Sequence, residues 1–134
     1  MDDREEQAHP GNDSPLAEGA LHGYRVIDLA TGQAASVAAM VLAECGAEVV
    51  KLSLKGRPSR LSPVQRSMWD RSKSAESLDL LEAADRARFA ELLAGTDVLL
   101  HDLTPPEARL LELDEATLAA RYPALIASSV TGWP

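Results

Sequence analysis

The stretch "YRVIDLATGQAASVAAMVLAECGAEVVKLS" (residues 24–53) carries the pattern that decides the fold. An apolar, β-branched run over 24–30 predicts a buried strand, and a nearly all-apolar run over 33–45 predicts a helix packed closely on a sheet. Gly46 stands where a helix ends in the left-handed conformation, and 47–53 predict a second strand. Such a strand, helix and strand form a βαβ unit, in which the strands are parallel and the crossover is right-handed.

The same alternation continues to the end of the chain. Residues 55–74 are rich in proline, serine and basic side chains without a period, and they predict a long loop. Strands are expected over 75–80, 96–103 and 124–130, and helices over 81–95, 105–113 and 114–123. The buried face of the first of these helices is expected to hold Leu81, Ala84, Ala87, Arg88 and Leu92. The pattern predicts an α/β fold with a largely parallel, open sheet and helices on both faces.

Composition limits the class of protein. A chain of 134 residues with 46% apolar content suits one domain around a single core. Acids outnumber bases by 21 to 13, and the net charge of −8 argues against a nucleic-acid partner. The single cysteine, Cys45, lies in an apolar helical run, so we expect a buried thiol, no disulfide framework and a reducing, cytoplasmic compartment.

The first twenty residues differ from the rest. Residues 1–20 contain six acids and one base, Arg4, and have no apolar segment of the kind that signal peptides contain. They predict a disordered acidic leader, with a charged regulatory tail as the alternative. No apolar run in the sequence is long enough to span a bilayer, so a soluble protein without a membrane partner is expected. The folded domain is expected over 21–134.

The glycine-bearing turn at the start of the first helix has two interpretations. A dinucleotide fingerprint needs G-x-G-x-x-G, but the turn contains only Gly32, followed by Gln33 and Ala34. An NAD site is therefore not expected. The helix N-terminus at the carboxyl end of a strand still favours anions. The other interpretation, that these small residues simply let the helix pack, stays open.

Two further groups of residues have side chains of the kinds found in metal sites and in serine hydrolases. His101, Asp102 and Glu107 have metal-ligating side chains, but no second His or Cys cluster stands at ligand spacing, so no metal site is expected. Ser128 and Ser129 follow a predicted strand without a G-x-S-x-G turn, so a serine hydrolase is not supported.

Four blocks of the chain resemble class III CoA-transferases (CaiB/BaiF type), a family that includes formyl-CoA transferase, carnitine-CoA transferase and α-methylacyl-CoA racemase. The first block, "LHGYRVIDLATGQAASVAAMVLAECGAEVVKL" (21–52), is similar to the family's opening strand, turn, helix and L-G-A-E-V-I-K-V-E strand. The others are "WDRSKSAESLDL" (69–80), "GTDVLLHDLTPPEARLLEL" (95–113) and "RYPALIASSVTGW" (121–133). The resemblance implies a Rossmann-like N-terminal half that binds CoA, in subunits that interlock as a homodimer or pair with the missing half of the fold.

The resemblance also implies a ligand site for CoA or acyl-CoA, with CoA as a substrate and no covalently bound cofactor. The residues that match the family's CoA-contacting turns after the first, third and fourth strands, together with one nearby base, are Gln33, Ala34, Leu78, Asp79, Leu80, Leu103 and Lys73. All three turns lie at carboxyl ends of strands, where an open α/β sheet is expected to bind ligands. Trp69 and Trp133 match aromatic residues near the family's CoA cleft, with ordinary packing as the alternative.

Several positions depart from the family pattern. Leu54, Leu81 and Leu110 stand where formyl-CoA transferase has basic residues, although CoA phosphates favour Arg or Lys. The family's Glu-Asn pair is replaced by His101-Asp102. The nearby bases that could substitute are Lys55, Arg57, Lys73 and Arg109. For each of these, a solvated surface charge is the preferred interpretation.

The resemblance implies chemistry that these residues do not supply. Family transferases use an Asp nucleophile, and the racemases exchange a proton with His and Asp; both sets follow the block that ends this sequence. No catalytic residue is therefore assigned, and the chain alone is expected to be inactive and to associate through exposed apolar surface. Two hypotheses stay open: the N-terminal portion of a CoA-transferase-like protein, or a diverged, truncated homologue that acts as a CoA-binding or subunit-pairing module. A third, a nucleotide-binding domain of another family, leaves the four ordered blocks unexplained.

Overall fold

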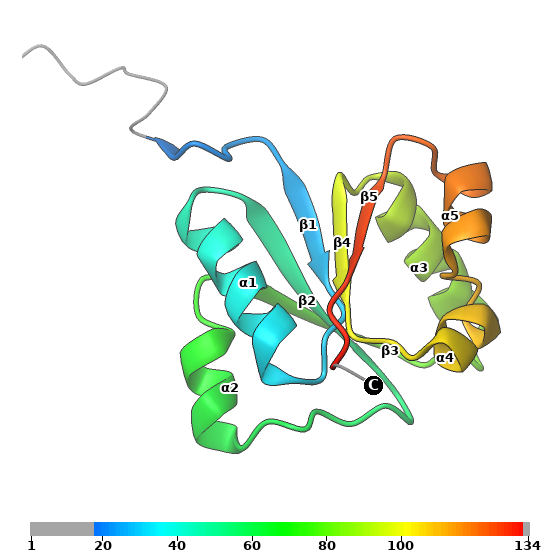
Figure 1. The fold of residues 1–134 in the computed structure, drawn as a ribbon, viewed down its shortest axis with the longest axis horizontal. Coiled ribbons are helices and arrows are strands. Elements are labelled where there is room, and N and C mark those ends of the chain that lie inside the picture. The colour runs from blue at the N-terminus through cyan, green and yellow to red at the C-terminus, as the bar shows by residue number, and fades with distance from the viewer. Residues whose placement is uncertain (1–17, 133–134) are drawn as a thin grey trace, which may run out of the picture.

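The computed structural model describes residues 18–132 and contains one five-stranded sheet (Figure 1). The strand order is β3-β2-β1-β4-β5, and every neighbouring pair is parallel. The strands are β1 (Arg25–Asp28), β2 (Glu48–Leu54), β3 (Ser74–Leu78), β4 (Val98–His101) and β5 (Ile126–Ser129). The predicted α/β fold with an open parallel sheet is confirmed; β1, β3, β4 and β5 are shorter than their sequence patterns suggested, and β2 is shifted by one residue.

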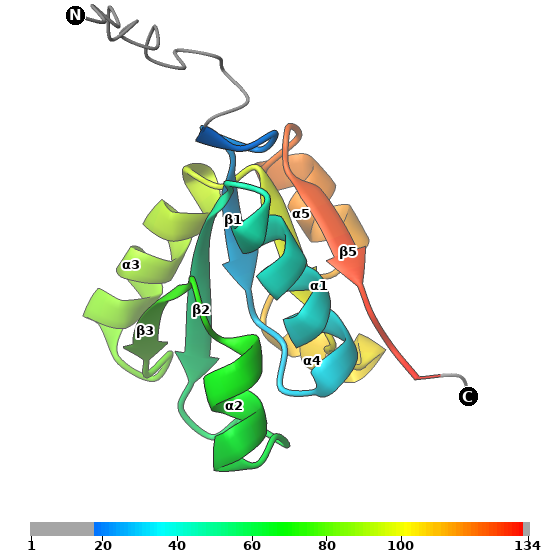
Figure 2. The same ribbon diagram turned by 90° about the vertical axis from the view of Figure 1, so that its left-hand side faces the viewer.

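Helices cover both faces of this sheet, as predicted. They are α1 (Gln33–Glu44), α2 (Pro63–Trp69), α3 (Ala83–Ala94), α4 (Pro105–Leu110) and α5 (Glu115–Arg121). The first two lie on one face, and the other three lie on the opposite face (Figures 1 and 2). Among residues 18–132, no helix has the length and apolar content needed to cross a bilayer.

The core has two parts because side chains alternate between the faces of a strand. Ile27, Leu52 and Leu99 belong to the larger cluster, which Phe89 and Leu93 of α3 complete. The smaller cluster lies under α1 and consists of Val26, Ala39, Ala47, Val49 and Leu100. Because apolar residues occur at successive positions of β1 and β4, both faces of the central strands are buried.

The predicted buried face of α3 is wrong. Leu81, Ala84, Ala87 and Arg88 are exposed, and Leu92 is only partly buried. Phe89 and Leu93 are buried instead. The helix begins at Ala83, so Leu81 lies in the turn before it, and the large Phe89 side chain removes more apolar area from water than the alanines would.

The long loop predicted over 55–74 contains helix α2, so that prediction is wrong in part. Ser62 caps this helix: its Oγ accepts a hydrogen bond from the Gln65 amide at 3.2 Å, and its own amide donates to Gln65 Oε1 at 2.9 Å. Pro63 occupies the first helical position. This capping box is a local helix signal, but the high proline and serine content of the segment favoured the prediction of a loop.

The end of α1 differs from expectation in one residue. Cys45 is exposed, so the predicted buried thiol is wrong: the residue lies at the C-cap, beyond the face that α1 packs on the sheet. Gly46 has φ of +102°, which confirms the predicted left-handed helix end. Its Cα lies beside Glu18 and Gly19, so the last residues of the predicted leader have a defined place. The rest of that prediction, residues 1–17, lies outside the described residues.

Substituting Gly46 by alanine is expected to destabilise the fold strongly. A Cβ at this position meets the Glu18 carbonyl oxygen at 2.7 Å, in addition to the cost of a positive φ. Gly56 is the matched control, because its φ is +85° and an added Cβ meets nothing within 4 Å. Chemical denaturation should show Gly46→Ala to be about 1–3 kcal/mol less stable than Gly56→Ala. Equal losses would show that the contact with Glu18 contributes nothing.

Candidate functional site

The strand order creates a crevice at the carboxyl end of the sheet. From β1 the chain proceeds to β2 and β3 on one side, and then returns to place β4 and β5 on the other. Connections leave β1 and β4 in opposite directions, and ligands of open α/β sheets bind at such a switch point. Here Thr31 and Gly32, which lead from β1 into α1, face Asp102, which follows β4.

Asp102 binds the N-terminal turn of α1. Its carboxylate accepts hydrogen bonds from the amides of Thr31 at 3.0 Å and Gly32 at 2.7 Å. Arg57 and Arg60 each place one guanidinium nitrogen 2.8 Å from it, and the Asp102 side chain is only 6% exposed. The two amides that lead into α1 are therefore occupied by a carboxylate of the protein itself.

The ionised form of Asp102 is strongly favoured. Burial raises the pKa of this carboxyl, but the combined hydrogen bonds from Arg57, Thr31, Arg60 and Gly32 outweigh burial and hold the pKa well below its usual range. Asp102 is consequently negative at any pH at which the protein works.

Arg57 is not a solvated surface charge, as had been preferred from the sequence. Its side chain is 15% exposed. Besides Asp102, it donates to the Leu29 carbonyl oxygen at 2.9 Å and to Glu107 Oε1 at 3.4 Å. This arginine therefore ties the ends of β1 and β4 together from the loop that follows β2.

A second buried ionic cluster lies below the same turn. Asp28 is fully buried and contacts Lys73 Nζ at 2.8 Å and Lys51 Nζ at 3.2 Å. Lys51 also donates to the Ala30 carbonyl oxygen, and Lys73 donates to that of Ser36 at 3.0 Å. Because the Lys73 side chain is 0% exposed, its interpretation as a surface charge is wrong. The cluster therefore makes hydrogen bonds on both sides of the turn that carries Gln33 and Ala34, at Ala30 before it and at Ser36 after it.

The residues implied as CoA contacts reach the same edge of the sheet but line different hollows. Gln33 and Ala34 are exposed and line a pocket of about 370 Å³ at the switch point, together with Arg60 and Asp102. Leu78 is 5% exposed and belongs to the core. Its side chain therefore faces away from the edge.

Asp79 and Leu80 line a second hollow, a groove of about 730 Å³ between α3 and the end of α4. Asp79 accepts from Lys55 Nζ at 2.7 Å and from the Leu81 amide at 3.0 Å. Leu81 and Leu110 flank this groove and are 85% and 82% exposed. Two of the three leucines that replace family bases thus lie together on one apolar surface.

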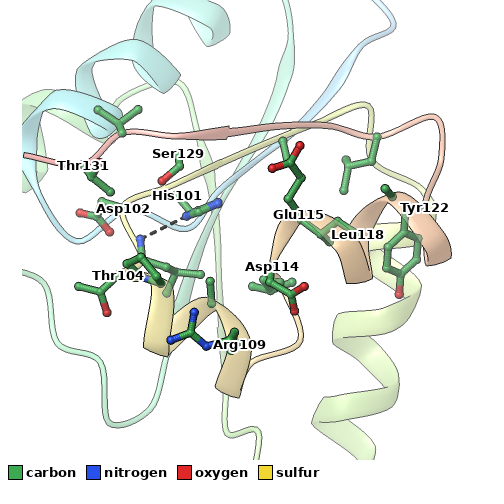
Figure 3. Close-up of a pocket in the computed structure, with 18 of the residues that line it drawn as sticks. His101, Asp102, Thr104, Arg109, Asp114, Glu115, Leu118, Tyr122, Ser129 and Thr131 are labelled. Carbon is green, nitrogen blue, oxygen red and sulfur yellow. Dashed lines mark hydrogen bonds between the residues drawn. The ribbon is translucent and has the colours of Figure 1, made fainter.

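The third and largest hollow, about 970 Å³, lies between β4, β5, α4 and α5 (Figure 3). Leu103 contributes to its wall and is 1% exposed. His101 also lines it, and its Nδ1 accepts a hydrogen bond from the Leu103 amide at 3.2 Å. Burial, with the nearby positive charge of Arg57, lowers the pKa of His101 despite the opposing effect of Asp102. The imidazole is therefore neutral near pH 7.

The metal-ligating side chains and the two tryptophans singled out in the sequence can also be located. Among residues 18–132, no group of three or more His, Cys, Asp or Glu side chains is arranged to hold a metal ion. Trp69 ends α2, and within that part of the chain its buried Nε1 has no hydrogen-bond partner. Trp133 lies outside the described residues. The clusters around Asp102 and Asp28 could not be predicted from the sequence, since their charged members contact residues 23 to 71 positions away.

Comparison with known proteins decides the family. The model of CoA-transferase family III matches residues 21–134. The chain belongs to CoA-transferase family III. The resemblance found in the four sequence blocks is thereby confirmed, and the family's members act on CoA thioesters.

Two curated relatives and one solved structure illustrate this family III membership. The chain is 32% identical over 113 residues to a CoA-transferase/lyase, DddD, of Marinomonas sp., covering 84% of this chain and 13% of the relative. It is 32% identical over 124 residues to the succinyl-CoA–L-malate CoA-transferase alpha subunit of Chloroflexus aurantiacus, covering 84% and 29%. The crystal structure of a CAIB/BAIF family protein from Brucella suis has the same fold, with a TM-score of 0.77 at 23% identity over 87% of this chain and 34% of that one. The family III chain thus spans less than a third of the two curated relatives.

Proposed function

We propose that this chain is the N-terminal portion of a class III CoA-transferase-like protein and that the carboxyl edge of its sheet binds CoA or acyl-CoA. The observation that carries the proposal is the family match over residues 21–134, combined with the position of the family's CoA-contacting turns. These turns follow β1, β3 and β4, and they lie at one edge of the sheet.

The arrangement of the edge favours a long ligand. Three strand spacings separate β3 from β4, a distance of about 14 Å at about 4.8 Å per step. A compact nucleotide would occupy a single hollow, whereas CoA is long enough to reach from the hollow at β3 to the hollow at β4. Gln33 and Asp79 offer exposed or partly exposed side chains to it, while buried Leu78 and Leu103 offer backbone groups only. Lys73 supports the turn below instead of meeting the ligand.

The groove beside Asp79 is proposed to hold the nucleotide end of CoA. Leu81 and Leu110 give it an apolar wall, and the bases on its rim are Lys55, Arg86 and Arg121. Each of these bases is already bonded: Lys55 to Asp79, Arg86 to two carbonyl oxygens and Arg121 to Glu112. Phosphate binding at this groove therefore requires exchange of the two exposed ion pairs, which individually contribute about 1 kcal/mol or less, or of the Arg86 hydrogen bonds.

Catalysis is proposed to need residues that these 134 do not supply. No catalytic residue is assigned within the chain, which is proposed to be inactive alone and to work in the cytoplasm. The alternative proposal is a non-catalytic homologue that binds CoA or pairs with another subunit as a homodimer. Exposed Leu81, Leu110 and Ile126 favour the alternative, since partners cover such side chains.

Calorimetric titration of the purified chain with CoA tests the ligand site, with NAD as the control ligand. We expect saturable heat with CoA and none with NAD. Gln33→Ala and Asp79→Ala should each weaken CoA binding about two- to tenfold, the value of one hydrogen bond.

Asp97→Ala is the matched control for Asp79→Ala. Asp97 also accepts a hydrogen bond from a backbone amide, that of Arg25 at 2.8 Å, but it lies at the opposite, amino edge of the sheet. Affinity for CoA should be unchanged in this variant. The absence of binding in the unsubstituted chain would overturn the ligand site and favour a pairing module.

A further inference from the structure

The cavity between β4, β5, α4 and α5 is lined by a histidine whose second ring nitrogen bonds to no residue among 18–132. His101 is 6% exposed, and its Nδ1 is taken by the Leu103 amide. A nitrogen that accepts from an amide carries no proton, so in the neutral ring the proton lies on Nε2. Figure 3 shows Nε2 directed into the cavity, and among residues 18–132 it has no hydrogen-bond partner.

The surroundings of this donor select the chemistry of a ligand. Ser129 pairs with His101 in the β4–β5 register, and directly paired residues of a parallel sheet lie on the same face. Its hydroxyl therefore stands beside the imidazole at the cavity wall. Further in, the wall is apolar and consists of Leu103, Ala108, Leu113, Leu118 and Leu125. A ligand that fits has an apolar body and one polar head.

The charges near the cavity disfavour an anionic head. Three acids, Asp102, Asp114 and Glu115, line it with two bases: Arg60 is bound to Asp102, and the charge of Arg109 is opposed by that of Asp114. With His101 neutral, acids outnumber bases in the lining, so the net charge opposes a carboxylate head. A carbonyl oxygen accepts from Nε2–H without bringing a charge into this apolar space.

We propose that this cavity is a binding site for neutral acyl compounds, with the ligand's carbonyl oxygen accepting from His101 Nε2–H and its apolar chain lying against Leu113 and Leu118. The cavity adjoins the pocket at Gln33, with which it shares Arg60 and Asp102, and the groove at Asp79, with which it shares Leu113 and Tyr122. His101 lines neither of those two hollows, so a ligand held by its Nε2–H does not require CoA to be bound there.

Nuclear magnetic resonance of the ¹⁵N-labelled full chain tests the site with a matched pair of probes, hexanamide and hexanoate. The chain has only three histidines, so the ring nitrogens of His101 can be assigned by substitution. The unliganded spectrum should show Nδ1 unprotonated and Nε2 protonated. Hexanamide should shift the Nε2 signal and the Ser129 amide saturably, and hexanoate should bind at least about tenfold more weakly because its charge must be buried.

Two variants separate binding from folding. His101→Phe keeps an aromatic ring and should weaken hexanamide binding about fivefold, the value of one neutral hydrogen bond. If that variant fails to fold, Ser129→Leu serves instead: this exposed position on an edge strand tolerates the change, and the larger side chain blocks the cavity beside His101. His22→Phe is the control and should bind hexanamide normally, since His22 is an exposed residue before β1.

Three results would overturn the proposal. They are a protonated Nδ1 in the unliganded chain, equal binding of hexanamide and hexanoate, and no saturable shift with hexanamide. Because CoA is titrated separately, loss of CoA binding with hexanamide binding intact would count against the proposed function alone.

Discussion

Asp102→Ala is expected to lower the free energy of unfolding by about 3–5 kcal/mol. The substitution removes the carboxylate that both Arg57 and Arg60 contact at 2.8 Å. It also leaves the amides of Thr31 and Gly32, just before α1, without their acceptor. Arg57 is the costly partner, because its side chain is only 15% exposed and, among residues 18–132, Glu107 is then the one acid left within ion-pair distance of it. Urea denaturation monitored by circular dichroism measures the loss.

The control for this variant is Glu44→Ala. Glu44 also pairs with an arginine, Arg71 at 2.7 Å, but the two side chains are 43% and 51% exposed. Exposed pairs contribute about 1 kcal/mol or less, so Glu44→Ala should be almost neutral. A loss for Asp102→Ala no larger than that of the control would show that Asp102 does not hold the switch point together.

The same carboxylate predicts how stability depends on pH. The folded pKa of Asp102 lies below the ordinary value of 3.8, so the unfolded chain takes up the proton first as the pH falls. The stability that Asp102 contributes is complete above pH 3.8 and is lost progressively below it. The difference between the unsubstituted chain and Asp102→Ala should therefore be constant from pH 5 to 8 and should narrow in acid; a constant difference down to pH 2 would contradict this.

Asp28→Asn should be about as damaging, at about 3–5 kcal/mol. Asp28 is fully buried between Lys51 and Lys73, with Lys73 fully buried as well, so loss of its charge leaves two ammonium groups with reduced compensation. Asp97→Asn, at an exposed position, is the control. Denaturation curves that coincide for the two variants would refute a structural role for this cluster.

A companion change shows whether charge or packing is responsible. Replacing Lys73 by Met in the Asp28→Asn background removes one of the two ammonium groups that have lost the Asp28 charge, and it keeps a long side chain. Part of the lost stability should return, since apolar replacements of buried ion pairs are often tolerated. A further loss in the double variant would show that Lys73 acts mainly through its hydrogen bond to the Ser36 carbonyl oxygen at 3.0 Å.

Much of the fold was predictable because it is encoded locally. The alternation of strand and helix patterns, the glycine after α1 and the apolar central strands all arise from short-range preferences. The parallel sheet follows from them, since a βαβ unit admits little else. The errors also have local causes: α2 was concealed by the proline and serine content around Ser62, and Cys45 falls one residue past the packed part of α1.

The site was less predictable because it is assembled from distant parts of the chain. Asp102 meets Thr31 across 71 residues, and Lys73 meets Asp28 across 45. A sequence pattern indicates that such charges exist, but not that the sheet brings them together. For the same reason the sequence pattern indicated that Arg57 and Lys73 are surface bases, whereas in the structure they pair with the buried carboxylates of Asp102 and Asp28.

The family resemblance predicted a ligand site at one edge of the sheet, and the structure shows three hollows along that edge. Gln33, Asp79 and Leu103 follow three different strands that end at one edge, and the structure places each beside a different hollow. A motif records which turns contact a ligand in relatives. The hollows are also lined by side chains such as Arg60 and Leu110, for which the motif gives no information.

The most direct test of the central proposal is a CoA titration followed by amide ¹H–¹⁵N spectra of the full chain. CoA bound across the carboxyl edge should shift the amides of Gln33, Ala34, Asp79, Leu80 and Leu103 together, with one common dissociation constant. The amides of Tyr24 and Gly95, at the amino ends of β1 and β4, should not move. Shifts confined to that amino edge, or no saturable shifts at all, would contradict the proposal that this edge of the sheet is the CoA site.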